Sequence, residues 1–234
     1  MSLFPNGHHS GMFVRASVDA VANCLVKWGN EELVSRFTTA EPKRMSLEEA
    51  WHHVEMRDFQ PDRGFLITVS GGWSAFFDNH RDEYLAQAEL YVISERLKTE
   101  TCFFFLDDRP ESIYRGTAHF SFDWFVGGDV PVGQRQVLLL KEDSWSLQQS
   151  GTPLPFEETD AYRVPDYREQ VKSELLRSYG AALGIPFWDP EAYGRDVYLL
   201  RWNTGPTTSA QKVRSILTAL WREVISEERK REHR

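Results

Sequence analysis

The stretch FLITVSGGWSAFF, residues 65–77, decides which fold we expect. Apolar side chains occupy every second position on both sides of a glycine pair, namely Phe65, Ile67 and Val69 before Gly71-Gly72 and Trp73, Ala75 and Phe77 after it. Alternation with a period of two is typical of β-strands, and a glycine pair between two such runs is typical of a tight hairpin turn. The stretch therefore predicts two antiparallel strands.

Strand-like runs recur on both sides of this hairpin. We expect strands at residues 12–16, 102–106, 113–125, 137–140, 145–147 and 196–202. The run 102–106 is apolar at every position, as in a strand that is covered on both faces. Residues 113–125 show the cleanest alternation, with aromatic side chains on one face and polar side chains on the other.

Helical spacing of apolar residues predicts helices between the strands. We expect them after Ser17 and within residues 51–56, 82–98, 166–184 and 208–225, two of them behind capping boxes at 46–49 and 166–169. The apolar stripe at 213–225 must pack against something, and the sheet is the nearest candidate. Hairpins mixed with helices predict an α+β fold, a largely antiparallel sheet with helices packed on it.

The length and composition indicate a folded domain with a substantial core. We expect residues 1–234 to form a single α+β domain, with the loop 151–165 as the place where two subdomains would divide. Hydrophobic residues make up 41% of the chain and aromatic residues 13%. The net charge of −8 disfavours nucleic acid and anionic membranes as partners.

The two cysteines, Cys24 and Cys102, lie far apart in apolar patterns, so we expect buried free thiols. The first residues lack the charged and apolar segments of a signal peptide. No stretch approaches the roughly 18 apolar residues that a membrane-spanning helix needs. We therefore expect a soluble, cytoplasmic protein.

Two clusters contain residue types that bind metal ions. Asp78, Asn79, His80, Asp82 and Glu83 lie close together in sequence, but the end of a strand, a turn and the first turn of a helix explain all of them except His80. Glu49 and His52 form a Glu-x-x-His pair, and Glu48, His52 and Glu55 would share a helical face. This pattern makes a metal-assisted hydrolase centred on Glu49, His52 and Glu55 an alternative function. No second Glu-x-x-His pair accompanies them, so we favour a solvated helical face and expect no metal or other cofactor.

His119, Ser121 and Asp123 have the residue types of a nucleophilic triad. They share one face of a single strand, where neighbouring side chains stand in parallel about 7 Å apart. A working triad needs side chains that converge from separate segments. We therefore interpret them as the polar face of a half-buried strand.

The loop FVGGDVPVG, residues 125–133, is the predicted contact surface. It carries Phe125, Val126, Val130 and Val132, whereas a connecting loop of this length is usually polar. Exposed apolar side chains on a loop tend to mark interaction sites. The alternative is that the loop folds back and buries its valines.

Since no motif forms a complete active site, the leading hypothesis is a non-catalytic protein that binds another protein. Its size, acidity and aromatic content are similar to those of many bacterial immunity and regulatory proteins, without a shared motif. The rival is the metal-assisted hydrolase centred on Glu49, His52 and Glu55. A third alternative is a small-ligand pocket between the sheet and its helices.

Overall fold

The computed structural model describes residues 8–31, 36–39, 42–54, 62–78, 83–107, 118–127, 133–141, 145–163 and 173–203. The strands are β1 (His8–Val14), β2 (Arg36–Thr39), β3 (Lys43–Arg44), β4 (Asp62–Val69), β5 (Trp73–Asp78), β6 (Glu100–Asp107), β7 (Ala118–Val126), β8 (Gly133–Lys141), β9 (Trp145–Ser150) and β10 (Tyr193–Asn203). The helices are α1 (Val18–Glu31), α2 (Leu47–Val54), α3 (Glu83–Leu97) and α5 (Ser173–Leu183), with 3-10 turns η2 (Thr159–Tyr162) and η3 (Pro190–Ala192).

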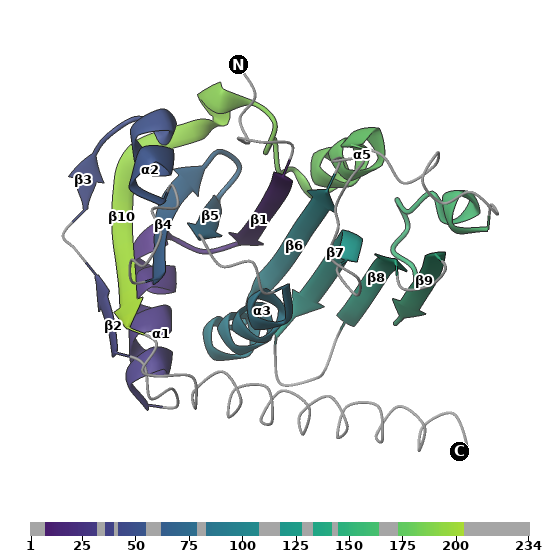
Figure 1. Cartoon of the computed structure of the whole chain (residues 1–234), viewed down its shortest axis with the longest axis horizontal. Helices are drawn as coiled ribbons and strands as arrows, with labels where there is room; N and C mark the ends of the chain where they lie inside the picture. The colour runs from purple at the N-terminus through teal and green to yellow at the C-terminus, as the bar shows by residue number, and fades with distance from the viewer. Residues whose placement is uncertain are drawn as a thin grey trace.

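All ten described strands belong to one sheet, in the order β2-β10-β4-β5-β1-β6-β7-β8-β9, with β3 also paired to β10 (Figure 1). Each described strand pair is antiparallel. β1 occupies the middle of the sheet, between β5 and β6. The predicted α+β fold, a largely antiparallel sheet with helices packed on it, is confirmed.

The predicted hairpin at the glycine pair is confirmed as β4 and β5, in which Phe65 faces Phe77 and Val69 faces Trp73. Gly71 and Gly72 have φ angles of 80° and 83°, a region that side chains other than glycine rarely adopt. A side chain at Gly71 would also come 2.9 Å from the carbonyl oxygen of Gly184. The turn therefore needs glycine for its own conformation and for its contact with the chain after α5.

Helices cover both faces of the sheet and create two core clusters. α2 and α5 pack on one face with Phe104, Phe122 and Phe187, whereas α1 and α3 pack on the other with Phe103 and Phe105. Successive residues of β6 enter opposite clusters, which confirms that the apolar run 102–106 is covered on both faces. Cys24 and Cys102 are buried free thiols, as predicted.

Local helix signals are also confirmed where the structure describes them. Ser17 Oγ accepts a hydrogen bond from Ala20 N at 3.3 Å before α1. The Ser46 to Glu49 capping box has both of its bonds, Ser46 N to Glu49 Oε2 at 2.7 Å and Glu49 N to Ser46 Oγ at 3.2 Å. The capping box at 166–169, the helix at 208–225 and the first part of the strand at 113–125 lie outside the described residues.

The segment after β9 packs against the sheet. Ala161 and Tyr162 belong to the cluster on the α2 and α5 face, and Leu154 and Phe156 pack against it. The single-domain assignment of residues 1–234, with its break within 151–165, stays a prediction, because part of that loop lies outside the described residues. No helix in the described ranges is long and apolar enough to cross a membrane.

Candidate functional site

The candidate site forms where α5 ends and the chain turns back toward the sheet. Gly184, with a φ angle of 72°, ends the helix. Ile185 N donates to Gly180 O at 2.7 Å and Gly184 N donates to Ala181 O at 3.1 Å. These two bonds make a Schellman motif, which satisfies the last carbonyls of the helix and reverses the chain. Pro186 follows and prevents the helix from continuing.

The reversed chain is held firmly by Phe187. Its ring stacks on Phe104 with a centroid separation of 4.7 Å and an interplanar angle of 6°. A side chain at Gly180 would come 2.5 Å from this ring, so the helix approaches it closely only because residue 180 is glycine. The carbonyl oxygen of Phe187 accepts a hydrogen bond from the Tyr193 hydroxyl at 2.8 Å. The backbone of this segment is therefore fixed by contacts within the protein.

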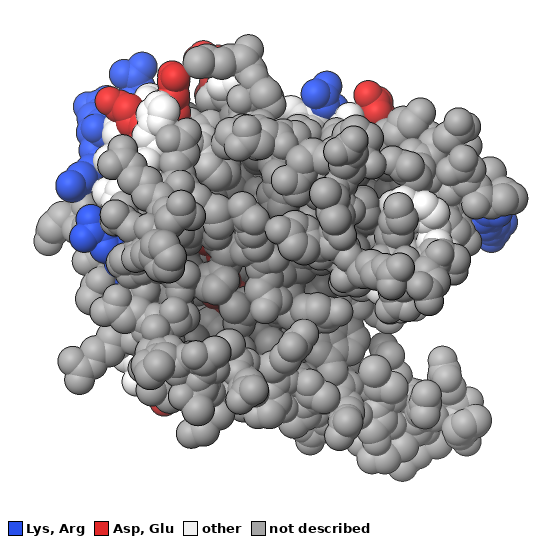
Figure 2. Space-filling view, viewed as in Figure 1, with Lys and Arg blue, Asp and Glu red and all other residues white. Residues whose placement is uncertain are grey.

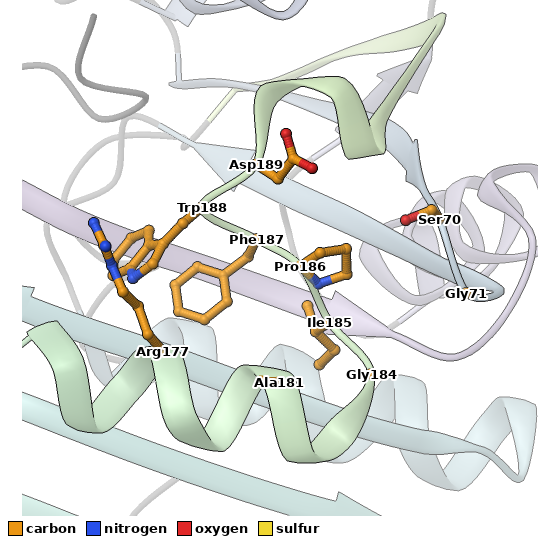
Figure 3. Close-up of a pocket in the computed structure, with 10 residues that line it drawn as sticks. All are labelled: Ser70, Gly71, Arg177, Ala181, Gly184, Ile185, Pro186, Phe187, Trp188 and Asp189. Carbon is orange, nitrogen blue, oxygen red and sulfur yellow. The ribbon is translucent and has the colours of Figure 1, made fainter.

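These constraints leave a pocket of about 380 Å³ at the surface, which we call the Trp188 pocket. Its walls are the hairpin turn at Ser70 and Gly71, the end of α5 at Arg177 and Ala181, and residues 184–189 (Figure 3). Ile185 and Phe187 are buried and form its apolar base. Trp188 is half-buried and tilts against Phe187 with a centroid separation of 4.1 Å.

Two charged side chains are among the described residues that line the Trp188 pocket. The guanidinium carbon of Arg177 lies 5.2 Å from the centroid of the Trp188 ring, in a cation–π arrangement that orients an otherwise flexible side chain (Figure 3). Among the described residues, no carboxylate forms an ion pair with Arg177. Asp189 Oδ1 accepts a hydrogen bond from Glu191 N at 3.0 Å and caps η3. The pocket thus combines an apolar base with an exposed, oriented cation.

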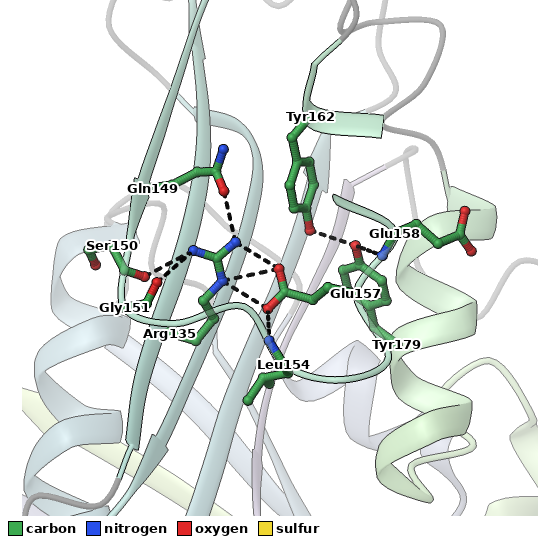
Figure 4. A network of polar contacts seen from close by, with 9 residues as sticks. All are labelled: Arg135, Gln149, Ser150, Gly151, Leu154, Glu157, Glu158, Tyr162 and Tyr179. Carbon is green, nitrogen blue, oxygen red and sulfur yellow. Dashed lines mark hydrogen bonds and ion pairs between the residues drawn. The ribbon is translucent and has the colours of Figure 1, made fainter. Parts of the chain in front are cut away.

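A buried ion pair fixes the segment that leads toward α5 (Figure 4). Arg135 on β8 and Glu157 have side chains that are 1% and 0% exposed, and Arg135 Nη2 lies 2.8 Å from Glu157 Oε2. Arg135 also donates to Gln149 Oε1 and to the carbonyl oxygens of Ser150 and Gly151. Glu157 Oε1 accepts a further bond from Leu154 N at 2.8 Å. Every charged atom of the pair is therefore satisfied inside the protein.

A tyrosine pair continues this arrangement to α5. The hydroxyls of Tyr162 and Tyr179 lie 2.5 Å apart, and Glu158 N donates to the Tyr179 hydroxyl at 3.2 Å (Figure 4). Burial raises the pKa of both phenols, so neither ionises at neutral pH. Tyr179 lies two residues after Arg177 on α5, and these bonds therefore help to position the helix that presents Arg177.

Of the residues considered for the alternative metal site, the structure describes Glu48, Glu49 and His52 on α2. The carboxylate of Glu49 caps α2, and the hydrogen bonds from the backbone and side chain of Ser46 lower its pKa. His52 is exposed on α2, whereas Glu55 and His80 lie outside the described residues. Within the described ranges, no three residues of metal-binding type come together.

The interpretation of Ser121 and Asp123 as the polar face of a half-buried strand is wrong. Both residues are fully buried, because the face of β7 that carries them packs in the same cluster as α3. Ser121 Oγ donates to Asp123 Oδ2 at 2.6 Å, and Gln136 Nε2 donates to Asp123 Oδ1 at 2.7 Å. The polar atoms of Ser121 and Asp123 thus lie closer together than the spacing of neighbouring side chains on one face of a strand suggests. The side chain of His119 lies outside the described part of the chain.

The predicted contact loop is described only at its start. Phe125 is 6% exposed, since its ring lies under Tyr91 of α3 at a centroid separation of 6.2 Å. Its expected exposure is therefore wrong, whereas Val126 is half-buried. Val130 and Val132 lie outside the described residues, so binding through this loop stays a prediction.

A second cavity of about 610 Å³ lies beside the start of α1. Tyr198 donates a hydrogen bond to Asp19 and Ser74 donates to the carbonyl oxygen of Ala16, so these polar groups are already paired. Around the nearby end of the sheet, over α2 and β3, Figure 2 shows basic and acidic side chains next to one another. The described charges there form no patch of a single sign, and we regard the Trp188 pocket as the better candidate.

No protein-family model, no curated protein and no solved structure matches the chain. Arg177 and Trp188 were not among the site residues predicted from the sequence. The sequence signal for them is GIPFWD at 184–189, in which a helix-ending glycine and a proline are followed by two aromatic residues.

Proposed function

We propose that the chain is a non-catalytic binding protein that recognises another protein through the Trp188 pocket. One observation carries this proposal. Arg177 is oriented on the Trp188 ring at the edge of an apolar pocket, and it has no ion-pair partner among the described residues.

The composition and rigidity of the pocket support recognition. Tryptophan and arginine are enriched among the few residues that dominate the energy of protein interfaces. The Schellman motif and the packing of Phe187 fix the pocket in advance, which reduces the entropy lost when a ligand binds. Its volume falls in the lower part of the range of about 300–1,000 Å³ that is usual for ligand pockets.

The chemistry of the lining supports binding rather than catalysis. Arg177 and Asp189 are the ionisable residues among the described lining residues. An oxygen of Asp189 is already committed to the cap of η3. Arginine stays protonated and does not act as a general base at neutral pH.

We further propose a cytoplasmic location and a partner other than nucleic acid. Two buried free thiols and no disulfide among the described residues agree with a reducing compartment. The net charge of −8 agrees with a partner that is not a polyanion.

The proposal is tested with a neutral probe that mimics one apolar residue of a partner, N-acetylphenylalaninamide. We expect saturable NMR shifts of the Trp188 indole and of the amides of Gly184, Ile185 and Phe187. A dissociation constant near 1 mM corresponds to about −4.1 kcal/mol, which is reasonable for one anchoring residue.

Two neighbouring alanines on α5 provide a matched pair of variants. Ala181 lines the pocket and Ala182 does not, and both are exposed. Ala181→Phe should fill the pocket and abolish the shifts, whereas Ala182→Phe should retain them. Absence of shifts in the native protein, or equal shifts in both variants, would refute the proposal. Melting temperatures of both variants verify that they are folded.

A further inference from the structure

The charge at the edge of the Trp188 pocket defines the chemistry of its ligand. A planar guanidinium presents its N–H donors as a rigid fork that matches the two oxygens of a carboxylate. The guanidinium carbon of Arg177 lies 5.2 Å from the centroid of the Trp188 ring, and Arg177 forms no ion pair with a described residue. The remaining base of the pocket, Ile185 and Phe187, is apolar. A ligand that satisfies both parts carries an apolar group and an anion close together.

A carboxylate fits this pocket better than a phosphate. Phosphate carries more negative charge and is usually held by several donors. Arg177 is the one cation among the described lining residues, and Asp189 contributes a carboxylate to the same lining. A single negative charge is therefore balanced by Arg177, whereas a second one would be repelled by Asp189.

The openness of the pocket indicates that the ligand is the end of a longer chain. Ser70, Gly71, Gly184 and Asp189 of the lining are all exposed. A small free molecule in such a shallow site would keep much of its surface in water, whereas typical small-molecule sites bury about 70–90% of their ligand. Apart from its chain neighbours, no described residue lies within 4 Å of the position that a side chain at Gly184 would take, so a chain has room to leave the pocket there.

We propose that the Trp188 pocket binds the C-terminal residue of a partner polypeptide. Its apolar side chain lies against Ile185 and Phe187, and its free carboxylate pairs with Arg177. A C-terminal residue is the one position of an unmodified polypeptide that carries an apolar side chain and a carboxylate on the same residue. This inference rests on the proposed function, since it specifies which part of the partner enters the pocket.

The experiment compares free and amidated C-termini. Octapeptides attached through their N-termini and randomised at the last four positions are presented with either end group. We expect the native protein to select an apolar last residue among the free acids. The best selected peptide should bind about five- to tenfold more tightly as the acid than as the amide, the scale of one charge-assisted hydrogen-bonded pair at a partly exposed site.

Two arginine variants test whether Arg177 reads the carboxylate. Arg177→Gln should reduce the preference for acid over amide to about one. Arg163→Gln is the matched control, because Arg163 is an exposed arginine away from the pocket whose partner is Asp160 at 3.3 Å, and it should retain the preference. Equal binding of acid and amide by the native protein, or a preference that survives in Arg177→Gln, would overturn the inference.

The outcomes separate this inference from the proposed function. Binding of the neutral probe without an acid preference would leave the proposed function in place and overturn the assignment of a C-terminal ligand. The selected peptide should also bind at least about tenfold more tightly than the N-acetylated form of its last residue alone. Equal affinities would assign the pocket to small carboxylic acids and overturn the polypeptide assignment.

Discussion

Replacing Glu157 with glutamine should lower the free energy of unfolding by about 3–5 kcal/mol. The side chains of Glu157 and Arg135 are 0% and 1% exposed, so the substitution leaves a guanidinium charge in the interior without a counterion. Arginine cannot escape this cost by losing its proton. The new amide also points N–H donors at the donors of Arg135, where two carboxylate oxygens now accept hydrogen bonds.

The assay is thermal and urea unfolding at neutral pH. For a chain of this length, 1 kcal/mol corresponds to a shift of about 2–4 °C in melting temperature, so Glu157→Gln should melt about 6–20 °C below the native protein. Glu158→Gln is the matched control, because Glu158 is exposed and contributes only its backbone N–H to the tyrosine pair. It should stay within about 0.5 kcal/mol of the native protein.

A double variant separates the cost of a lone charge from the value of the ion pair. Arg135→Met combined with Glu157→Leu removes both charges and should recover most of the stability lost in Glu157→Gln, because well-packed apolar pairs often replace buried ion pairs at little cost. A single variant within about 1 kcal/mol of the native protein would refute the reasoning, since the pair would then be accessible to water.

Three further predictions concern the capping box, the contact loop and the metal alternative. The native protein should be more stable than Glu49→Ala at pH values above the ordinary carboxyl pKa, and this difference should disappear as the pH falls through the lowered pKa of Glu49. The reason is that a carboxyl group with a lowered pKa stabilises the folded state only while it is ionised. Urea titrations at several pH values measure the difference, and a difference independent of pH would contradict the prediction. Val130→Asp should leave stability within about 0.5 kcal/mol while weakening self-association or partner binding, as followed by sedimentation and calorimetry, and a large loss of stability would instead show that the valine is buried. Protein purified without added metal and without a histidine tag should hold no stoichiometric zinc, iron or manganese; a stoichiometric metal that is lost in His52→Ala would support the hydrolase.

Local signals account for the parts of the fold that the sequence predicts well. The glycine pair at 71–72 sets its own backbone conformation, and the Ser46 to Glu49 box closes over three residues. Both depend on residues that are adjacent in the chain. The apolar run at 102–106 is likewise a local signal. Its residues are apolar at every position, which predicts coverage on both faces even though the covering segments are not known from the sequence.

The errors and omissions arise where distant segments meet. Ser121 and Asp123 alternate as an exposed polar face would, and only the packing of that face beside α3 buries them. Arg135 is equally inconspicuous in its strand, because its partner Glu157 lies 22 residues later. The Trp188 pocket combines a hairpin turn at residue 70 with the end of α5 and the segment after it. No local period in the sequence brings these three segments together.

The position of β1 restricts the order in which the sheet can assemble. Among the described strands, β1 alone joins two parts of the sheet. One part contains β5, β4, β10 and β2, and the other is the meander β6 to β9. The ribosome synthesises β1 before either neighbour, and its partners in residues 73–78 and 100–107 appear much later. Such distant pairings are slow to form, because a long loop must close before any contact compensates for its lost entropy. β1 must therefore wait for both of its neighbours until residues 73–78 and 100–107 have been made, and the two parts of the sheet cannot join before then.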